Sequence, residues 1–254
     1  MNLDTSQIEF SHKDRLRKIK LPKKLNSLLA EDLGFHIGDG HMSIQMSNEG
    51  YKRYGFNYSG DKRYDKEYFN NILIKRKNRL FNISCKSRNY KYKNEIICTF
   101  NSKAILQFFN KIFCVPLNKK DNISIPKIIL NSNKKVKAAF LRGLFDSDGS
   151  LCLKNRKNNI YPTINLTSKS KRLIANTLRL LNEFKFSVTS YNRDRYDKRT
   201  FKRYKQSCLD INGANMVKKW MKDIRFNNKK HLIKYYKWAQ GESNSRSSPY
   251  LEFM

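Results

Sequence analysis

Two carboxylates stand at the same point of two short motifs, about a hundred residues apart in the chain. Residues 34–40 read Gly-Phe-His-Ile-Gly-Asp-Gly, and residues 143–149 read Gly-Leu-Phe-Asp-Ser-Asp-Gly. Both follow the pattern Gly-x-x-x-small-Asp-Gly, so Asp39 and Asp148 are equivalent. Carboxylate oxygens are ligands that hard cations such as Mg²⁺ favour, and bound metal ions promote phosphodiester hydrolysis. The pair therefore predicts a metal-dependent hydrolytic site.

The charge of the chain indicates the substrate of such a site. Lys and Arg number 53 against 21 Asp and Glu among 254 residues, a formal net charge of +32. A codon bias toward Lys and Asn adds basic residues, but it does not explain why acids are so few. Aromatic residues interrupt the basic runs at 86–93 and 193–199, which is typical of structured faces. The composition predicts binding to a polyanion, and with the two acids it favours metal-dependent cutting of nucleic acid.

Cysteine usage and hydropathy indicate the cellular compartment of the protein. The five cysteines, at 85, 98, 114, 152 and 208, form no C-x-x-C pair, and the four histidines add no ligand spacing. We therefore expect no disulfide framework, no zinc site and a reducing compartment. No apolar run approaches membrane-spanning length, and the N-terminus lacks the apolar core of a signal peptide. We expect a soluble intracellular protein of the cytoplasm, nucleoid or an organelle matrix, not secreted and without a membrane partner.

The elements around the two motifs recur in one order. Helices are predicted over about 25–40 and 137–148, each ending at an Asp-Gly pair where glycine can take the left-handed C-cap conformation. Asp65, Ser102 and Ser170 are predicted to cap further helices. β-branched and aromatic residues broken by turn residues predict four hairpins. Their ranges are 42–59, 84–100, 151–167 and 186–212.

The spacing between equivalent residues is nearly constant. It is 109 positions from Asp39 to Asp148, 105 from Asp65 to Ser170 and 112 from Ser102 to Ala214. Such agreement predicts an internal repeat. The predicted division is a basic N-terminal arm (1–24), a first repeat (25–117), a linker (118–136), a second repeat (137–239) and a flexible tail (240–254).

Small residues within the motifs predict how the repeats meet. Gly34 and Gly38 lie four residues apart, as do Gly143 and Ser147, so each helix carries a stripe of small residues on one face. Such stripes allow two helices to pack closely around an approximate two-fold axis. Both acids would then lie at helix C-terminal ends, where the helix dipole is negative and a divalent cation relieves the repulsion. One Asp-Gly alone is commonly just a helix stop, but two matched copies favour a functional site.

Residues 141–149 resemble the signature of the LAGLIDADG homing endonucleases, and residues 34–40 resemble its variant ending in Gly-Asp-Gly. The resemblance extends over residues 25–238 and indicates the single-chain, two-repeat, monomeric type. It implies an α+β fold of two pseudo-symmetric αββαββα units. The motif helices pack at their interface, and the antiparallel sheets form a saddle over DNA. It also implies Mg²⁺-dependent cutting of both strands of a long duplex target, leaving short 3′ overhangs, with Mn²⁺ or Ca²⁺ able to replace Mg²⁺ in binding.

The resemblance also implies roles for single residues. The catalytic acids carry over to Asp39 and Asp148, with Gly38 and Ser147 beside them in the metal site. Ile37 stands where the second motif has Asp146, so Asp146 receives no catalytic role, and His36 is expected to be a hydrogen-bonded core residue. The family keeps basic or amide residues near each active site. The candidates for these assisting groups are Gln45, Lys62 and Lys169, with Lys154 as a further one.

The predicted strands carry candidate DNA contacts. Arg and Lys suit guanine edges and Asn and Gln suit adenine, although each candidate could equally contact phosphate or only solvent. Besides Gln45, the candidates are Ser47, Lys52, Tyr54, Lys86, Arg88, Tyr90, Lys154, Asn155, Arg156, Asn165, Arg193, Arg195 and Lys202.

Two other functions fit the same fold. One is an RNA-binding intron maturase, with intron RNA as partner, and the other is a catalytically inactive DNA-binding regulator. Intact acids in both motifs favour cutting, and no helix-turn-helix is evident. Since no protein-splicing module flanks the repeats, we expect a free-standing, intron-encoded form rather than an intein.

Overall fold

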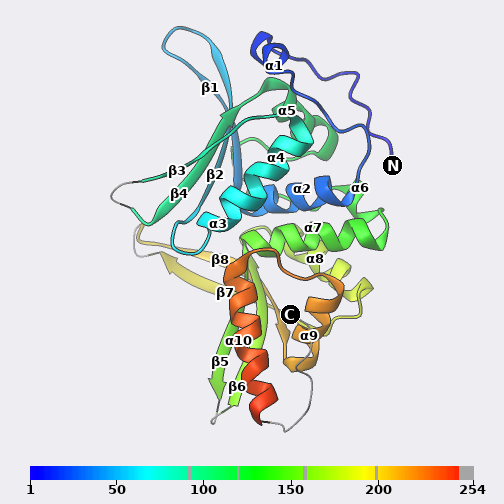
Figure 1. Ribbon diagram of the computed structural model, residues 1–254, viewed down its shortest axis with the longest axis vertical. Coiled ribbons are helices and arrows are strands. Elements are labelled where there is room, and N and C mark those ends of the chain that lie inside the picture. Colours follow the sequence, from blue (N-terminus) through cyan, green and yellow to red (C-terminus); the bar gives the residue numbers. More distant parts are fainter. Residues whose placement is uncertain (91–92, 119, 157–158, 198–199, 246–254) are drawn as a thin grey trace.

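Two halves of the same architecture lie one above the other along the long axis of the molecule (Figure 1). The computed structural model describes residues 1–254 except 91–92, 119, 157–158, 198–199 and 246–254. Each half contains one antiparallel four-stranded sheet, ordered β1-β2-β4-β3 in the first half and β5-β6-β8-β7 in the second. The identical strand order confirms the predicted α+β fold of two repeats.

The first half is built from short elements. Its strands are β1 (Gly40–Met46), β2 (Lys52–Asp61), β3 (Ser87–Asn89) and β4 (Glu95–Asn101). Its helices are α1 (His12–Leu16), α2 (Ser27–Asp39), α3 (Lys66–Tyr68), α4 (Ile74–Phe81) and α5 (Lys103–Gln107). Two π-helical segments, Phe69–Leu73 and Phe108–Ile112, join α3 to α4 and extend α5.

The second half has longer strands. After α6 (Lys127–Leu130) in the linker come α7 (Lys134–Ser147), β5 (Gly149–Arg156), β6 (Asn159–Ser168) and α8 (Lys171–Glu183). They are followed by β7 (Val188–Asp197), β8 (Lys202–Asn212), α9 (Ala214–Asp223) and α10 (Lys229–Ser245). Helix α10 thus continues six residues into the predicted tail (240–254), and residues 246–254 lie outside the described part. No helix of the described residues is long and apolar enough to cross a membrane.

The predicted helix caps are confirmed in two of three cases. The hydroxyls of Ser102 and Ser170 accept backbone N–H bonds within the first turns of α5 and α8. Asp65 makes no such bond, so the capping prediction was wrong there. Its carboxylate instead accepts hydrogen bonds from the backbone N–H of Asp61 and the side chain of Asn228.

The predicted left-handed glycine at the end of each motif helix is also wrong. Gly40 is extended, with φ −75° and ψ 146°, and β1 begins at this residue. Gly149 likewise begins β5. Each motif helix therefore passes directly into the first strand of its sheet, which fixes the position of its aspartate relative to that sheet.

The close packing of the motif helices is confirmed. A Cβ atom added to Gly34 would lie 2.1 Å from the carbonyl oxygen of Phe140, and one added to Gly143 would lie 2.0 Å from that of Glu31. One added to Gly38 would lie 2.0 Å from the hydroxyl oxygen of Ser147. These distances leave no room for a side chain, so the small residues are what allows α2 and α7 to touch along their length.

A buried charged network, which the sequence analysis did not predict, supports the same interface. Arg76 donates to Glu31 at 2.7 Å and pairs with Asp32, which also accepts a 2.8 Å bond from Lys77. From the second half, Arg142 donates to the other carboxylate oxygen of Glu31 at 3.0 Å. The bond from Arg142 to Glu31 joins α7 to α2, and loss of Arg142 would remove one partner of a buried carboxylate at the interface.

Candidate active site and nucleic-acid interface

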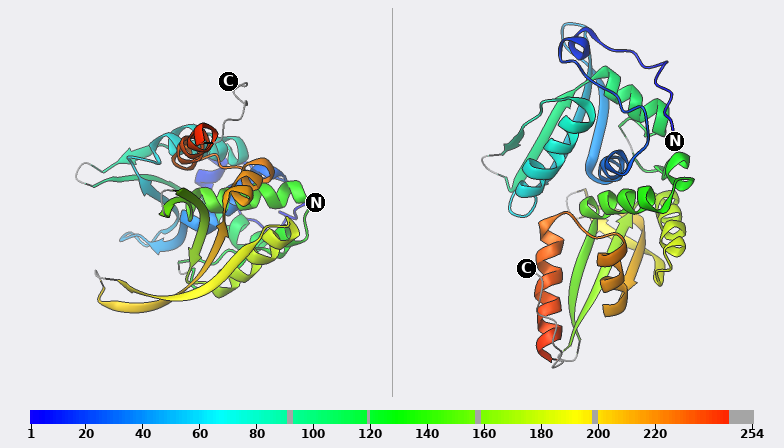
Figure 2. Two further views of the ribbon diagram at one scale, coloured as in Figure 1. Left: turned by 90° about the horizontal axis from the view of Figure 1, so that it is seen from below. Right: turned by 45° about the vertical axis from the view of Figure 1, so that its right-hand side comes forward.

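The two motif aspartates meet where α2 and α7 end. Asp39 is the last residue of α2, and Asp148 directly follows α7. The two helices run side by side in all the views of Figures 1 and 2. A Cβ atom on Gly38 would lie 3.3 Å from the carboxyl carbon of Asp148, so the acid of the second motif lies against the backbone of the first.

The electrostatic surroundings make both acids hard to ionise. Burial, and then repulsion from Asp148, raise the pKa of Asp39 to about 7. Burial also raises the pKa of Asp148, although Lys120 and Lys230 oppose the shift. A carboxyl group whose pKa is raised by burial and by a neighbouring acid is typical of a functional site rather than of a simple helix stop.

Two lysines that the sequence analysis missed approach this pair of acids. The ammonium group of Lys120 donates to the backbone carbonyls of Ile37, at 3.0 Å, and of Gly38. Lys230 pairs with Asp65 at 3.0 Å and lies close enough to Asp39 and Asp148 to lower the pKa of both. The lysines are 110 positions apart, close to the offset of 109 between the motif acids, so the repeat offset could have revealed them. Lys120 lies in the linker and Lys230 in the first turn of α10.

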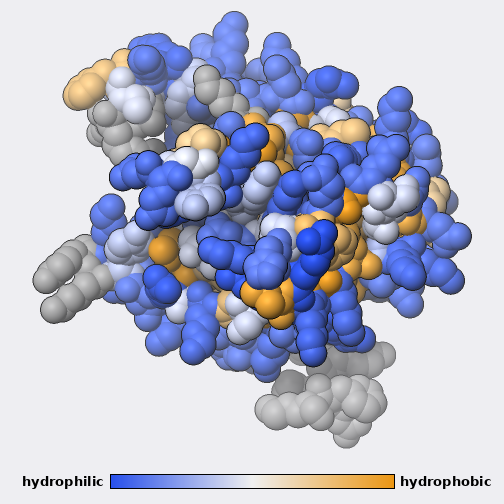
Figure 3. Space-filling view, turned by 90° about the horizontal axis from the view of Figure 1, so that it is seen from above, coloured by the Kyte–Doolittle hydropathy of each residue, from blue (hydrophilic) through white to orange (hydrophobic). Residues whose placement is uncertain are grey.

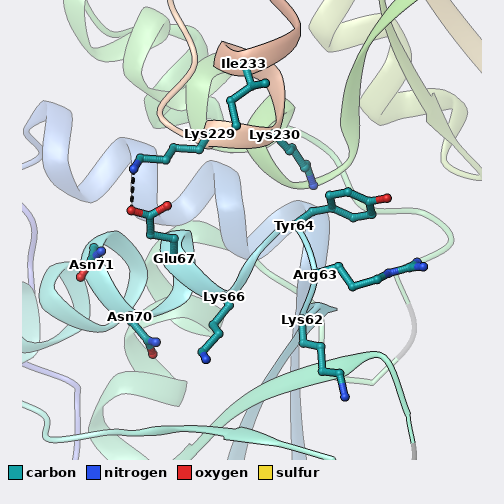
Figure 4. A pocket seen from close by; sticks show the side chains of 10 residues that line it. All are labelled: Lys62, Arg63, Tyr64, Lys66, Glu67, Asn70, Asn71, Lys229, Lys230 and Ile233. Carbon is teal, nitrogen blue, oxygen red and sulfur yellow. Dashed lines mark hydrogen bonds and ion pairs between the residues drawn. The ribbon is translucent and has the colours of Figure 1, made fainter.

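A basic pocket of about 400 Å³ opens beside Lys230, between α10 and the turn that leads from β2 into α3 (Figure 4). Its cationic lining comes from both halves of the chain: Lys62, Arg63, Lys66, Lys229 and Lys230. Glu67 is the one acidic side chain among its lining residues, and it is paired with Lys229. The pocket therefore presents an excess of positive charge next to the acids.

The donor atoms at the helix ends fit a hard divalent cation. Two carboxylates are oxygen ligands of the kind that Mg²⁺ and Ca²⁺ prefer, and the carbonyl oxygen of Gly38, predicted as a further ligand, accepts a hydrogen bond from Lys120 in this structure. The Ser147 hydroxyl donates its hydrogen to the carbonyls of Gly143 and Leu144, and its oxygen keeps a lone pair, so the assignment of Ser147 to the metal site stays a prediction. Among the described residues no group of three or more His, Cys, Asp or Glu could hold a metal, so water and phosphate oxygens would complete the shell.

The raised pKa of Asp39 predicts pH-dependent binding of cations. Below about pH 7 Asp39 carries a proton that a divalent ion must displace, whereas above this pH the carboxylate is already free. We therefore expect the affinity for Ca²⁺ to fall about tenfold for each pH unit below 7 and to level off above it. Calorimetric titration with Ca²⁺ between pH 5 and 8, in buffers of different ionisation enthalpy, measures both the affinity and the released proton. Asp39→Asn should lower the proton release and leave only the share of Asp148, whose pKa is also raised, and an unchanged release would contradict the assignment.

The predicted assisting residues lie at different distances from the acids. Gln45 is six residues along β1 from Asp39, or roughly 20 Å at the usual strand rise, so it does not reach the acids. Lys62 directly follows β2 and lines the basic pocket. Lys169 follows β6, and its ammonium group lies 4.4 Å from the centre of the Tyr204 ring. Lys62 and Lys169 remain candidates, whereas Gln45 is better placed to contact DNA.

Strand register separates the predicted DNA contacts into two sets. Helices cover one side of each sheet, and the long hairpins project to the same side of the molecule (Figure 2). We call the uncovered side the open face; in β1 and β2 it carries Gln45, Arg53 and Asn57, opposite the buried Met42 and Phe56. The predicted contacts that alternation places on the open face are Gln45, Arg88, Lys154, Asn165, Arg193, Arg195 and Lys202.

Three predicted contacts lie on the other side of their sheets. Lys52 and Tyr54 share a side with the buried Phe56, and Asn155 shares one with the buried Leu151. Successive strand residues point to opposite sides, so these residues do not face a duplex bound on the open face. As DNA contacts, Lys52, Tyr54 and Asn155 stay predictions that binding of a duplex on the open face does not favour.

The remaining predicted contacts occupy turns and strand ends. Ser47 lies in the turn between β1 and β2, and Lys86 and Tyr90 flank β3. Arg156 ends β5, and its side chain lies outside the described residues. The sequence analysis also missed open-face residues that the register reveals, namely Arg53, Asn57, Tyr191 and Gln206.

Two residues that received no catalytic role have structural ones. His36 is buried, and its Nδ1 lies 2.8 Å from the hydroxyl oxygen of Tyr58, as expected of a core histidine. Asp146 is buried and accepts hydrogen bonds from the backbone N–H groups of Asn227 and Asn228. Asn228 also donates to Asp65, so these contacts dock the start of α10 against both halves.

The architecture defines a two-repeat protein whose matched acids meet at the interface of its motif helices. The family model described as the LAGLIDADG-like domain matches residues 135–225, which span most of the second repeat. The chain therefore contains a LAGLIDADG-like domain, and the resemblance inferred from the two motifs is confirmed.

Solved structures show the same fold over most of the chain. The homing endonuclease I-DmoI, in a complex with DNA and Ca, is 16% identical, with a TM-score of 0.57; the match covers 82% of this chain and 97% of that one. The LAGLIDADG homing endonuclease I-LtrWI, bound to its target DNA, is 11% identical, with a TM-score of 0.54; the match covers 88% of this chain and 92% of that one. The chain has the fold of the single-chain LAGLIDADG homing endonucleases.

Relatives in sequence come from Methanocaldococcus jannaschii. A probable translation initiation factor IF-2 is 31% identical over 235 residues, which are 89% of this chain and 18% of that protein. The uncharacterized protein MJ1054 is 26% identical over 83% of this chain and 22% of its own length. The chain thus spans about a fifth of the length of these two relatives.

Proposed function

We propose that the protein is a site-specific DNA endonuclease that cuts both strands of a long duplex target with the help of divalent cations, Mg²⁺ in the cell. The observation that carries the proposal is the meeting of Asp39 and Asp148 at the ends of two closely packed helices, where the pKa of each acid is raised. DNA-bound structures of proteins with this fold support a duplex as the substrate. Homing of an intron is the natural role that fits such an activity.

The chain's own residues supply binding and orientation. The open faces of the two sheets would bind the two halves of the target, and the differences between the repeats suit an asymmetric sequence. The carboxylates of Asp39 and Asp148 would hold the cations, which supply activation of water and stabilisation of the leaving oxygen. Structures of I-DmoI were solved with Ca and with Mn, which supports the use of divalent cations. Since one chain holds both acids, a monomer suffices to cut two strands.

Lys120 and Lys230 are the groups best placed to stabilise negative charge on the phosphate. Among the described contacts, Lys120 donates to the backbone carbonyl of Ile37 and Lys230 pairs with Asp65, so neither lysine forms a direct ion pair with Asp39 or Asp148. Ammonium groups fixed before the reaction stabilise the developing charge at little cost in reorganisation. The basic pocket next to Lys230 would hold a neighbouring phosphate of the bound strand.

Substitution of Lys120 tests this role. Lys120→Met should lower the cleavage rate by about 10²-fold, because it removes a cation beside the reacting phosphate. The affinity for the duplex in Ca²⁺ should be nearly unchanged, because Lys120 is one of many cationic contacts. Rates from single-turnover cleavage and affinities from anisotropy separate the two effects. Lys219→Met is the matched control, since Lys219 lies on α9, pairs with Asp223 and is not part of the basic pocket. Equal rates for the two variants would contradict the proposed role.

Cleavage of a randomised duplex library tests the function itself. Incubation with Mg²⁺, followed by sequencing of the cut ends, should recover one long recognition sequence, and chelation of the metal should abolish the cuts. The two alternatives, an RNA-binding intron maturase and an inactive DNA-binding regulator, predict no enriched ends in either condition. The retention of both acids next to two lysines supports cutting over these alternatives.

A further inference from the structure

A second basic groove, of about 660 Å³, lies at the outer end of the first sheet, between α1 and the β1–β2 hairpin. Figure 3 looks onto this end of the molecule, where hydrophilic side chains predominate. The basic side chains that line the groove come from three elements: His12, Lys13, Arg17, Lys52, Arg53 and Lys103. The groove is separate from the acids and from the pocket beside Lys230.

The N-terminal arm forms one wall of the groove and is firmly attached. Asp14 of α1 is fully buried, and its carboxylate accepts hydrogen bonds from the hydroxyls of Ser11, at 2.7 Å, and Ser102, at 2.6 Å. It also accepts the backbone N–H of Ala104 at 3.1 Å. These bonds hold α1 against the start of α5, so the arm is a built part of the fold rather than a loose basic segment.

The charge of the groove is not balanced by its own lining. Five side chains there are permanent cations, of which Arg53 alone belongs to the open face, and Glu49 is the only carboxylate among the lining residues. Lys103 is paired with Glu9 from the arm. Cations held near one another by a fixed helix repel each other, which lowers the stability of the fold, and a bound polyanion removes this repulsion. The complementary ligand is therefore a chain of phosphates.

Aromatic side chains distinguish this groove from a simple phosphate contact. The Tyr51 side chain is 70% exposed. The ammonium group of Lys103 lies 5.9 Å from the centre of the Tyr54 ring. Exposed rings beside cations suit unpaired bases, which stack on them, whereas the bases of a duplex are already stacked on each other. Lys52 and Tyr54 lie on the helix-covered side of the sheet, so a duplex on the open face does not reach them.

We propose that this groove binds a single-stranded polynucleotide, with its phosphates on the cations of α1 and the hairpin and a base stacked on Tyr51. This binding is additional to the endonuclease activity and does not depend on cleavage. RNA and single-stranded DNA share the chemistry that the groove recognises, and the experiment below distinguishes them.

Fluorescence anisotropy with labelled oligouridylate and oligothymidylate tests the proposal. Both probes are titrated with the full chain, alone and after saturation with unlabelled duplex DNA in Ca²⁺. We expect at least one probe to bind equally well in the presence of duplex, and the tighter of the two identifies RNA or DNA as the partner. Tyr51→Ala and the double variant Lys13→Gln/Lys52→Gln should each weaken this binding about tenfold and leave duplex affinity unchanged.

Arg195→Gln provides the matched control on the open face, because Arg195 is exposed there and far from α1 in sequence. It should weaken duplex binding without changing the affinity for the single strand. Displacement of the single-stranded probe by duplex would overturn the proposal. So would a result in which Arg195→Gln loses probe binding while the groove variants bind the probe as well as the wild type does. Neither result depends on cleavage, so failure of the endonuclease assay and failure of this inference are distinguishable.

Discussion

Asp39→Asn and Asp148→Asn are each expected to lower the rate of double-strand cleavage by at least about 10³-fold. The amide keeps the shape of the side chain but removes the charge that would hold the cation. Binding of the duplex should persist, because the contacts along the open faces are unchanged and one negative charge is lost from a surface that attracts phosphate. Single-turnover cleavage of the target recovered from the library measures the rate, and anisotropy in Ca²⁺ measures the binding.

Asp61→Asn is a suitable control for these variants. Asp61 ends β2 near the same region, but its carboxylate is accessible to solvent and paired with Arg63, which lowers its pKa to about 2. The control should cut within about twofold of the wild-type rate, as expected of a surface ion pair. If both motif variants also cut at the wild-type rate, the acids do not carry the reaction.

Gly143→Ala is expected to lower the free energy of unfolding by about 3 kcal/mol or more. The added Cβ atom would lie 2.0 Å from the carbonyl oxygen of Glu31 and 2.9 Å from the backbone nitrogen of Phe35. Backbone atoms on α2 cannot move aside without separating the two helices. Urea denaturation followed by circular dichroism measures the effect.

Gly241→Ala is the matched control for that substitution. Gly241 lies within α10, and a Cβ atom added to it would meet nothing within 4 Å. The control should be unchanged or more stable by up to about 1 kcal/mol, because alanine favours a helix over glycine. Equal stabilities of the two variants would mean that α2 and α7 do not pack as closely as described.

The repeat and its helix interface could be predicted because their signals are local. The spacing of small residues in each motif determines how near two helices can come, and the stripe of Gly34 and Gly38 needs no knowledge of the rest of the fold. The acids follow from the same motifs. Ser102 and Ser170 are likewise predictable as caps, since a cap bonds to its own helix.

Which side of the sheet a strand residue points to depends on the pairing register, which the sequence alone does not give. Gln45 pairs with Arg53, so Lys52 and Tyr54 fall on the other side of the sheet. The pairing depends on how many residues form the turn, and a shift of one residue moves a whole strand's side chains to the opposite face. The predicted contacts on β1 and β2 were therefore divided between two faces.

The lysines of the site were missed for a different reason. Lys120 lies in the linker, 81 residues after Asp39, and Lys230 lies in the first turn of α10, 82 residues after Asp148. They reach the acids only because those segments return to the interface of the two halves. Asp65 was misassigned for the same reason, since its partner Asn228 is 163 residues away.

Mapping both cut ends of the recovered target, strand by strand, tests the central claim most directly. With Mg²⁺ we expect one cut in each strand at fixed positions, offset to leave short 3′ overhangs. Neither cut should appear after chelation of the metal or in the Asp39→Asn/Asp148→Asn double variant. Cuts at scattered positions, cuts that survive chelation, or fixed cuts made by the double variant would contradict a metal-dependent site built from the two acids.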